Sequence, residues 1–294
     1  SLMVHPRLEA SLNLLRFFHY HTHPLRRAPS IMTTPSYCRT IFCSALLLIL
    51  SSVSIARADF PFLFEIDEVD EEIVQWEIDE PLREASISDS DSLNNIESHM
   101  PSKHAYSDKD LITWGHETTH GLNSRLRNEN GGTGNVNAFY CLDGRYVVFK
   151  EPKLTINQIA KEVPDDLHGM SFKLYMHQGA WNNEPLYILD EWVAYTNGAQ
   201  IRYELGITSR GETVRQMMEF AVYSITLCSM LPDDYEQKEE LTNFVRWQLA
   251  RCIQVYQLND SIGGIGKAHE YVHRMQEELG PSFDTFEMRI AGVF

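Results

Sequence analysis

Basic residues are scarce in this sequence. Its 294 residues include 25 Lys and Arg against 41 Asp and Glu, so the formal net charge is −16 at pH 7. Proteins that bind nucleic acid or anionic membrane surfaces use clustered positive charge to attract phosphates. The sequence has no such basic patch, and we therefore expect no nucleic-acid partner.

Cysteine is also sparse. The chain has five cysteines and no Cys-x-x-Cys pair, so a zinc site built from cysteines is not expected. Cys228 and Cys252 lie on successive helical stretches, and two cysteines can pair in an oxidising compartment. We favour this bridge, although spacing alone does not determine which cysteines pair.

Long apolar runs are absent apart from one, IFCSALLLILSSVSI at residues 41–55. A polar stretch from Met32 precedes it, and the small-residue pattern Ala-Arg-Ala ends at Ala58. Because a bilayer span needs about 20 apolar residues, we predict a secretory signal peptide cleaved after Ala58 rather than a membrane anchor or a buried helix. The protein would then be secreted or periplasmic, without a stable membrane anchor, and residues 1–31 would be an upstream extension.

The segment from residue 59 to residue 103 differs in composition from the rest of the chain. Residues 59–84 are strongly acidic with interleaved apolar side chains, which predicts one or two strands in a solvated arm. A propeptide that covers a functional site is the alternative. Residues 86–103 are rich in Ser, Asp and Asn, which is typical of a linker. Residues 104–294 would form the main domain.

Helical periodicity dominates that domain. Ser107 is predicted to cap a first helix, and residues 128–137 are typical of a mobile loop. Asp143-Gly144 predicts a two-residue turn in a hairpin over residues 138–150. Further helices are expected at 155–164, 167–178, 185–205, 212–231, 235–258, 267–279 and 282–290. The fold class is therefore α+β and mostly α, with a small sheet and a C-terminal helical bundle.

One stretch has the residue pattern of a metal site. Residues 116–120 are HETTH, and two histidines four apart on a helix share one face, where both imidazoles can bind one zinc ion. Glu117, beside the first histidine, can take a proton from a zinc-activated water. A second match, HEYVH at 269–273, is flanked by Lys267 and Arg274, which would place charge where packing is needed. We assign the metal to the first match and expect the second to lie on an amphipathic surface helix.

A catalytic zinc ion needs a third protein ligand, with water in the fourth position. The pattern HExxHxxGxxH is excluded because Asn123 and Leu126 stand at its Gly and third His positions. The later candidates are Glu129, Glu151, Glu162, His168, His177, Glu184, Asp190 and Glu191. We favour Glu191, because an acid within an apolar helical stretch needs a partner. Asp190 would then accept the second ring N–H of a ligand histidine, although these two roles could be exchanged.

HETTH followed by a helix with DEWVAY at 190–195 resembles the gluzincin metallopeptidases, the thermolysin- and aminopeptidase-like class. The resemblance covers residues 107–200 at most and is at the level of motifs. It implies a zincin-like fold that binds Zn²⁺, with Glu117 as general base. The zinc ligands that it implies are His116, His120 and Glu191. The chain departs from the pattern of this class in two ways. The gap between His120 and Glu191 is longer than in the thermolysin type, and Tyr195 stands where several members have an Asp.

The predicted function is that of a secreted zinc-dependent peptidase, with residues 104–294 as its catalytic domain and a peptide or protein as its substrate. Tyr195 and His177 are candidates for stabilising the oxyanion that forms during hydrolysis. Two alternatives stay open: a zinc hydrolase that acts on a non-protein amide, such as one of the cell wall, and a non-catalytic extracytoplasmic protein with a vestigial motif.

Overall fold

The computed structural model describes residues 75–290, with side chains described as far as residue 279. These residues all belong to the second of two compact units, Phe60–Phe294. The predicted signal peptide and the acidic residues before position 75 lie outside the described residues.

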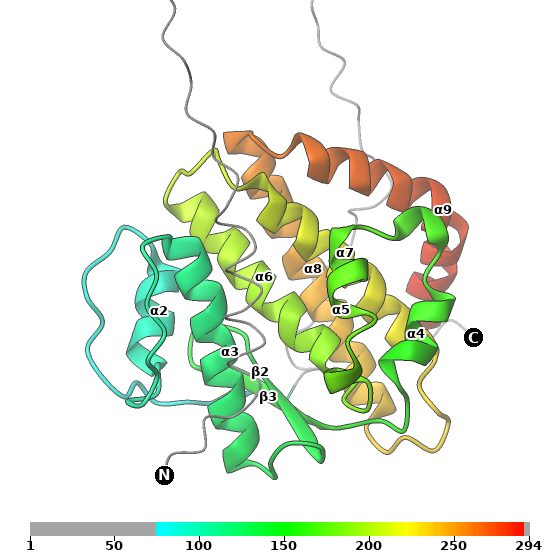
Figure 1. Ribbon diagram of the computed structural model, residues 1–294, viewed down its shortest axis with the longest axis horizontal. Helices are drawn as coiled ribbons and strands as arrows, with labels where there is room; N and C mark the ends of the chain where they lie inside the picture. The colour runs from blue at the N-terminus through cyan, green and yellow to red at the C-terminus, as the bar shows by residue number, and fades with distance from the viewer. Residues whose placement is uncertain (1–74, 291–294) are drawn as a thin grey trace, which may run out of the picture. The chain divides into compact units, whose positions relative to one another are not determined.

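The described part of the chain is mostly helical, with one small antiparallel sheet (Figure 1). This confirms the predicted fold class, α+β and mostly α. The strands are β1 (Glu77–Ile78), β2 (Val136–Tyr140) and β3 (Arg145–Lys150), in the order β1-β3-β2. The helices are α2 (Asp91–His99), α3 (Leu111–Glu129), α4 (Ile156–Glu162), α5 (Met170–Tyr175), α6 (Tyr187–Glu204), α7 (Gly211–Ser229), α8 (Lys238–Ile262) and α9 (Gly266–Ile290).

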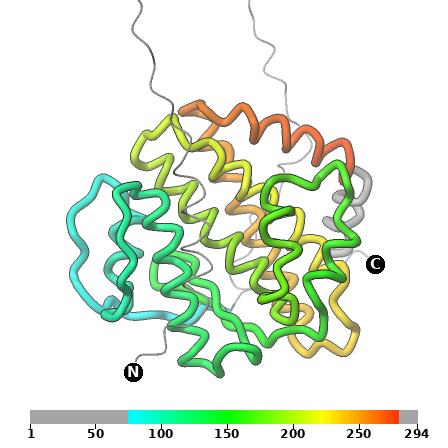
Figure 2. The backbone as a smooth tube through the Cα atoms, viewed as in Figure 1, coloured from blue at the N-terminus to red at the C-terminus, as the bar shows by residue number. Residues whose placement is uncertain are grey.

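Helix α6 is the centre of the arrangement and packs against α2, α3, α7 and α8 (Figures 1 and 2). Every side chain from Ile188 to Ala199 is buried. A helix that is buried on all sides normally carries only apolar residues, so the two acids in its first turns, Asp190 and Glu191, require partners. The partners of Asp190 come from α3.

Helices α3 and α6 approach closely at a glycine. A Cβ atom added at Gly115 would lie 2.3 Å from the Cδ1 atom of Ile201 on α6, which is far too close for a real contact. The absence of a side chain at Gly115 therefore allows the two helices to pack together one residue before His116.

The hairpin predicted over residues 138–150 is confirmed, but its turn differs from the prediction. Strand β2 ends at Tyr140 and β3 begins at Arg145, so four residues and not two connect the strands. The last three of them, Leu142, Asp143 and Gly144, all have positive φ angles. Asn95 of α2 accepts a hydrogen bond from Asp143 N at 3.0 Å, so a distant helix stabilises the turn and local preference alone does not set it.

The linker predicted for residues 86–103 is wrong, because residues 91–99 form α2. Ser90 caps this helix by accepting a hydrogen bond from Leu93 N at 3.0 Å. Glu204 of α6 also accepts hydrogen bonds from the hydroxyls of Ser90 and Ser92, at 2.6 and 2.7 Å. Leu93 and Ile96 are buried in one cluster with residues of α3 and α6. The polar composition of this segment reflects capping and anchoring rather than flexibility.

Three other local predictions need correction. Helix α3 begins at Leu111 and is capped by Asp110, not by Ser107, because the Asp110 carboxylate accepts a hydrogen bond from Ile112 N at 3.2 Å. The loop predicted over 128–137 is shorter, since α3 extends to Glu129. The two helices predicted at 267–279 and 282–290 form the single helix α9. Pro281 lies between the two predicted segments, and α9 continues past it. A proline removes only one hydrogen-bond donor, so a helix can include one.

The predicted disulfide between Cys228 and Cys252 is also wrong, since both thiols are free. The Sγ atom of Cys252 lies 3.6 Å from the sulfur atom of Met218 on α7. Met218 and Cys228 are separated along α7 by about 15 Å, at roughly 1.5 Å per residue. The register between α7 and α8 therefore keeps the two thiols apart.

Replacing Ile96 by Ala is expected to lower the free energy of unfolding by about 2 to 5 kcal/mol, the usual cost of removing a fully buried isoleucine side chain. Ile87 is fully exposed, and Ile87→Ala is the matched control, with an expected change within about 0.5 kcal/mol. Equilibrium urea unfolding measures both. Equal midpoints for the two variants would mean that α2 is not part of the folded domain.

Within residues 75–290, no helix combines the length and the apolar character needed to cross a lipid bilayer.

Candidate metal centre

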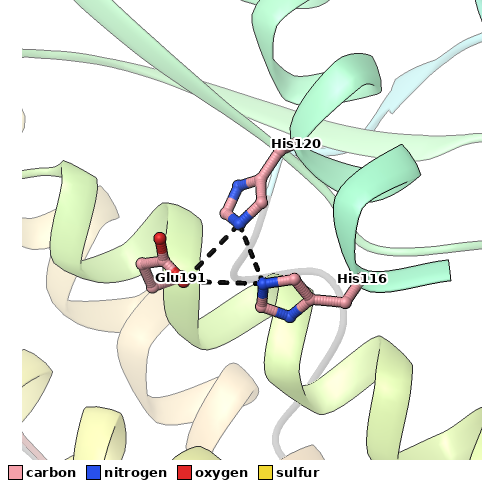
Figure 3. Close-up of side chains that lie close together, drawn as sticks. All are labelled: His116, His120 and Glu191. Carbon is pink, nitrogen blue, oxygen red and sulfur yellow. Dashed lines mark hydrogen bonds and ion pairs between the residues drawn. The ribbon is translucent and has the colours of Figure 1, made fainter. Parts of the chain in front are cut away.

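Two histidines of α3 and one glutamate of α6 point toward a common point (Figure 3). The Nε2 atoms of His116 and His120 are 3.2 Å apart, because one helical turn places both rings on the same face of α3. The Oε2 atom of Glu191 lies 3.7 Å from His116 Nε2 and 3.5 Å from His120 Nε2. The structure thus brings Glu191 to two histidines that lie far before it in the sequence.

These three distances suit a single small cation. Ligand atoms about 2.0 to 2.2 Å from a tetrahedral zinc ion lie roughly 3.3 to 3.6 Å from one another. The observed separations fall close to this range, and every pair of potential ligand atoms lies within 4.8 Å. Among the residues that the structure describes, this is the one group of three or more His, Cys, Asp or Glu side chains that could hold a metal ion.

The environment of Glu191 provides an independent test of the fit. Its side chain is buried, and its Oε2 atom has no hydrogen-bond partner in the described part of the chain. A buried carboxylate oxygen without a partner costs free energy, and a cation at this point would remove that cost. His120 keeps 20% of its side-chain surface exposed, so the group can be reached from the side of this ring.

Asp190 faces the other nitrogen of His120. Its Oδ1 atom lies 2.9 Å from His120 Nδ1 and accepts a second hydrogen bond, at 2.7 Å, from the amide of Asn123. Asn123 in turn accepts a hydrogen bond from Tyr140 N of β2 at 2.7 Å. A carboxylate at Nδ1 keeps the proton there and leaves Nε2 free to bind a metal. The neighbouring acids of α6 thus face opposite nitrogens of the same ring.

The electrostatic field at the group favours a positive charge. Burial alone would lower the pKa of His120, but the Asp190 and Glu191 carboxylates hold it well above its usual value. The pKa of His116 is well below its usual value because the ring is buried and lies beside His120. His116 is therefore a neutral imidazole, the form that binds metals.

Glu117 lies half-buried next to His116 on α3. Burial raises the pKa of its carboxyl group, the His120 ring opposes this rise, and the carboxylates of Glu191 and Asp108 add to it. The His120 ring and the Glu191 carboxylate thus both influence the pKa of Glu117. A carboxylate with a raised pKa is a better proton acceptor than an ordinary glutamate.

No family model, no curated protein and no solved structure matches this chain.

The two predicted oxyanion donors have different positions. The ring of Tyr195 lies 4.3 Å from that of His116, and its hydroxyl is 3.1 Å from the hydroxyl of Tyr175. Gln216 of α7 donates a hydrogen bond to the Tyr195 hydroxyl at 3.0 Å. His177 is exposed, with its ring edge-on to Phe172, and no interaction within the described residues joins it to the metal group.

The second HExxH match lies on α9, away from the group. Its two rings are 39% and 67% exposed, and each faces a single carboxylate, Asp260 for His269 and Glu277 for His273. His269 Nδ1 also lies 2.6 Å from the hydroxyl of Tyr256. The described residues do not bring a third ligand to this pair, because the helix faces solvent there.

Three residues at the site were not predicted from the sequence. Asn123 orients Asp190, Tyr187 donates a hydrogen bond to the Oε1 atom of Glu191, and Tyr175 contacts Tyr195. The spacing of Tyr187 and Glu191, four residues apart on one helix, could have indicated their contact. The positions of Asn123 and Tyr175 depend on contacts between elements, which spacing does not show.

Proposed function

We propose that this protein is a zinc-dependent peptidase of the zincin type, in which His116, His120 and Glu191 hold the zinc ion. The observation that carries the proposal is the spacing of the three ligand atoms, 3.2 to 3.7 Å, around the unpartnered Oε2 atom of Glu191. Two histidines and one glutamate, with a fourth position left for water, are a common ligand set of catalytic zinc. Glu117, which directly follows the first histidine of the motif, is the residue that would make this a catalytic site rather than a purely structural one.

When bound, the zinc ion would polarise the scissile carbonyl and lower the pKa of water to about 7. Glu117 accepts the proton of the attacking water and delivers it to the leaving amine, which needs a proton to depart. Asp190 keeps His120 in the tautomer that binds metal, through its contact at Nδ1. Tyr195, whose ring lies 4.3 Å from that of His116, and Tyr175, whose hydroxyl lies 3.1 Å from that of Tyr195, are the hydroxyl donors that we assign to the oxyanion. Export by the predicted signal peptide is part of the proposal.

Two matched variants test the proposal, since each changes the first histidine of one HExxH sequence. His116→Ala is expected to lose bound zinc and all hydrolysis of a fluorogenic peptide pool, because two remaining ligands hold zinc weakly. His269→Ala is expected to keep both properties. Metal analysis after purification and peptide assays before and after chelation provide the measurements.

Restored zinc should recover the activity of the chelated wild type and of His269→Ala only. The proposal fails if the wild type binds no metal, or if His116→Ala hydrolyses the peptides as fast as the wild type does.

A further inference from the structure

Tyr187 approaches Glu191 from the side opposite to the two imidazoles. Its hydroxyl donates a hydrogen bond to Oε1 of Glu191, whereas Oε2 faces the Nε2 atoms of His116 and His120. The two residues are four apart on α6, so they lie on one face of the helix. The two oxygens of a single carboxylate thus have different partners.

This division affects how Glu191 can bind a metal. A carboxylate can bind a cation through one oxygen or through both. Binding through both would turn Oε1 toward the ion and take up a coordination position. The hydrogen bond from Tyr187 engages Oε1 and would hold it away from a bound ion, whereas Oε2 lies 3.7 and 3.5 Å from the two imidazole Nε2 atoms.

The aromatic ring of Tyr187 is itself held in place. It stacks on Trp181 of the short helical turn η3 (Gly179–Trp181), with ring centroids 4.2 Å apart and planes inclined by 12°. The Trp181 side chain is buried, and its indole N–H donates to Gln178 at 3.1 Å. Stacking on a fixed ring restricts the rotation that would take the Tyr187 hydroxyl away from Glu191.

We propose that Tyr187 is a positioning residue that keeps Glu191 a one-oxygen ligand, so that one coordination position of the metal stays open to water and substrate. This inference rests on the proposed function, because it concerns the same metal. It adds a residue outside the ligand set and assigns it an effect on coordination number rather than on the chemical step.

The test is a titration of the metal-free, full-length protein with Co²⁺, whose visible absorption reports its coordination geometry. Tyr187→Phe removes only the hydroxyl. We expect it to bind Co²⁺ about 10- to 100-fold more weakly than the wild type, the usual effect of removing a hydrogen bond to a metal ligand. We also expect weaker visible absorption, because the released Oε1 atom would raise the coordination number from four to five.

Tyr271→Phe is the matched control. Tyr271 is a buried tyrosine of α9, and its hydroxyl donates to Leu167 O at 3.0 Å. It should lose a similar amount of stability while its cobalt affinity and spectrum stay unchanged. If Tyr187→Phe does not fold, Trp181→Phe loosens the same tyrosine and should shift the spectrum in the same direction by less.

The outcomes separate the two proposals. A wild type that takes up no Co²⁺ would overturn the metal site and with it the proposed function. A wild type that binds tightly, together with an unchanged affinity and spectrum in the folded Tyr187 or Trp181 variant, would overturn only the positioning role.

Discussion

Replacing Glu117 by Gln is expected to lower kcat/KM for peptide hydrolysis by about 10²- to 10⁴-fold, the contribution of a positioned general base, while the bound metal is retained. The amide keeps the size of the carboxylate but cannot accept a proton at neutral pH. Glu117 does not belong to the three-ligand group, so metal content should stay at the level of the wild type.

Glu129→Gln is the matched control for this experiment. It makes the same substitution on the same helix, at a side chain that is 56% exposed and pairs only loosely with Arg125, at 3.9 Å. Steady-state kinetics and metal analysis of both variants measure the effect. Full activity in Glu117→Gln would exclude Glu117 as the base, whereas loss of its metal would mean that the variant disturbs the ligands themselves.

The features that depend only on the spacing of residues along an α-helix could be predicted from the sequence. A spacing of four residues places His116 and His120 on one face whatever the rest of the fold does. The capping box of α4 is equally local, since Thr155 and Gln158 exchange hydrogen bonds within the first turn. Helix α6 also lies where its apolar sequence after Pro185 predicted it. These features depend on residues within about one turn of each other.

The choice between Asp190 and Glu191 could not be made in this way. Adjacent residues on a helix point about 100° apart, so one of the two acids had to face Nε2 of His120 and the other a different direction. Which one does so depends on the rotation of α6 against α3, and that rotation depends on tertiary contacts between the two helices. No local sequence pattern predicts this rotation.

The incorrect linker prediction and the placement of His177 also depend on contacts between distant elements. Residues 91–99 have the composition of a linker, and they form a helix because α3 and α6 offer Leu93 and Ile96 a place to be buried. His177 has suitable chemistry for an oxyanion donor but extends into solvent, since the segment around α5 directs it away from the metal group. Tertiary contacts determine both the helix at residues 91–99 and the position of His177.

Replacing Glu191 by Ala is expected to abolish the stabilisation of the fold by zinc. A ligand present at about 1,000 times its Kd stabilises the native state by about 4 kcal/mol. For a domain of this size, that corresponds to a rise in Tm of about 8 to 16 °C, at roughly 2 to 4 °C per kcal/mol. Glu191→Ala retains two imidazoles at most, so its Tm should be the same with and without zinc.

Glu162→Ala is the matched control, because Glu162 is an exposed acid on α4 that the sequence also allowed as a third ligand. It should show the full rise in Tm. Thermal unfolding of each protein with zinc and with a chelator gives a difference in which any direct effect of the substitution on stability cancels. A rise in Tm of equal size in Glu191→Ala would show that zinc binds elsewhere. A loss of the rise in this variant alone would place the metal at Oε2 of Glu191, the oxygen of the group that has no hydrogen-bond partner in the described part of the chain.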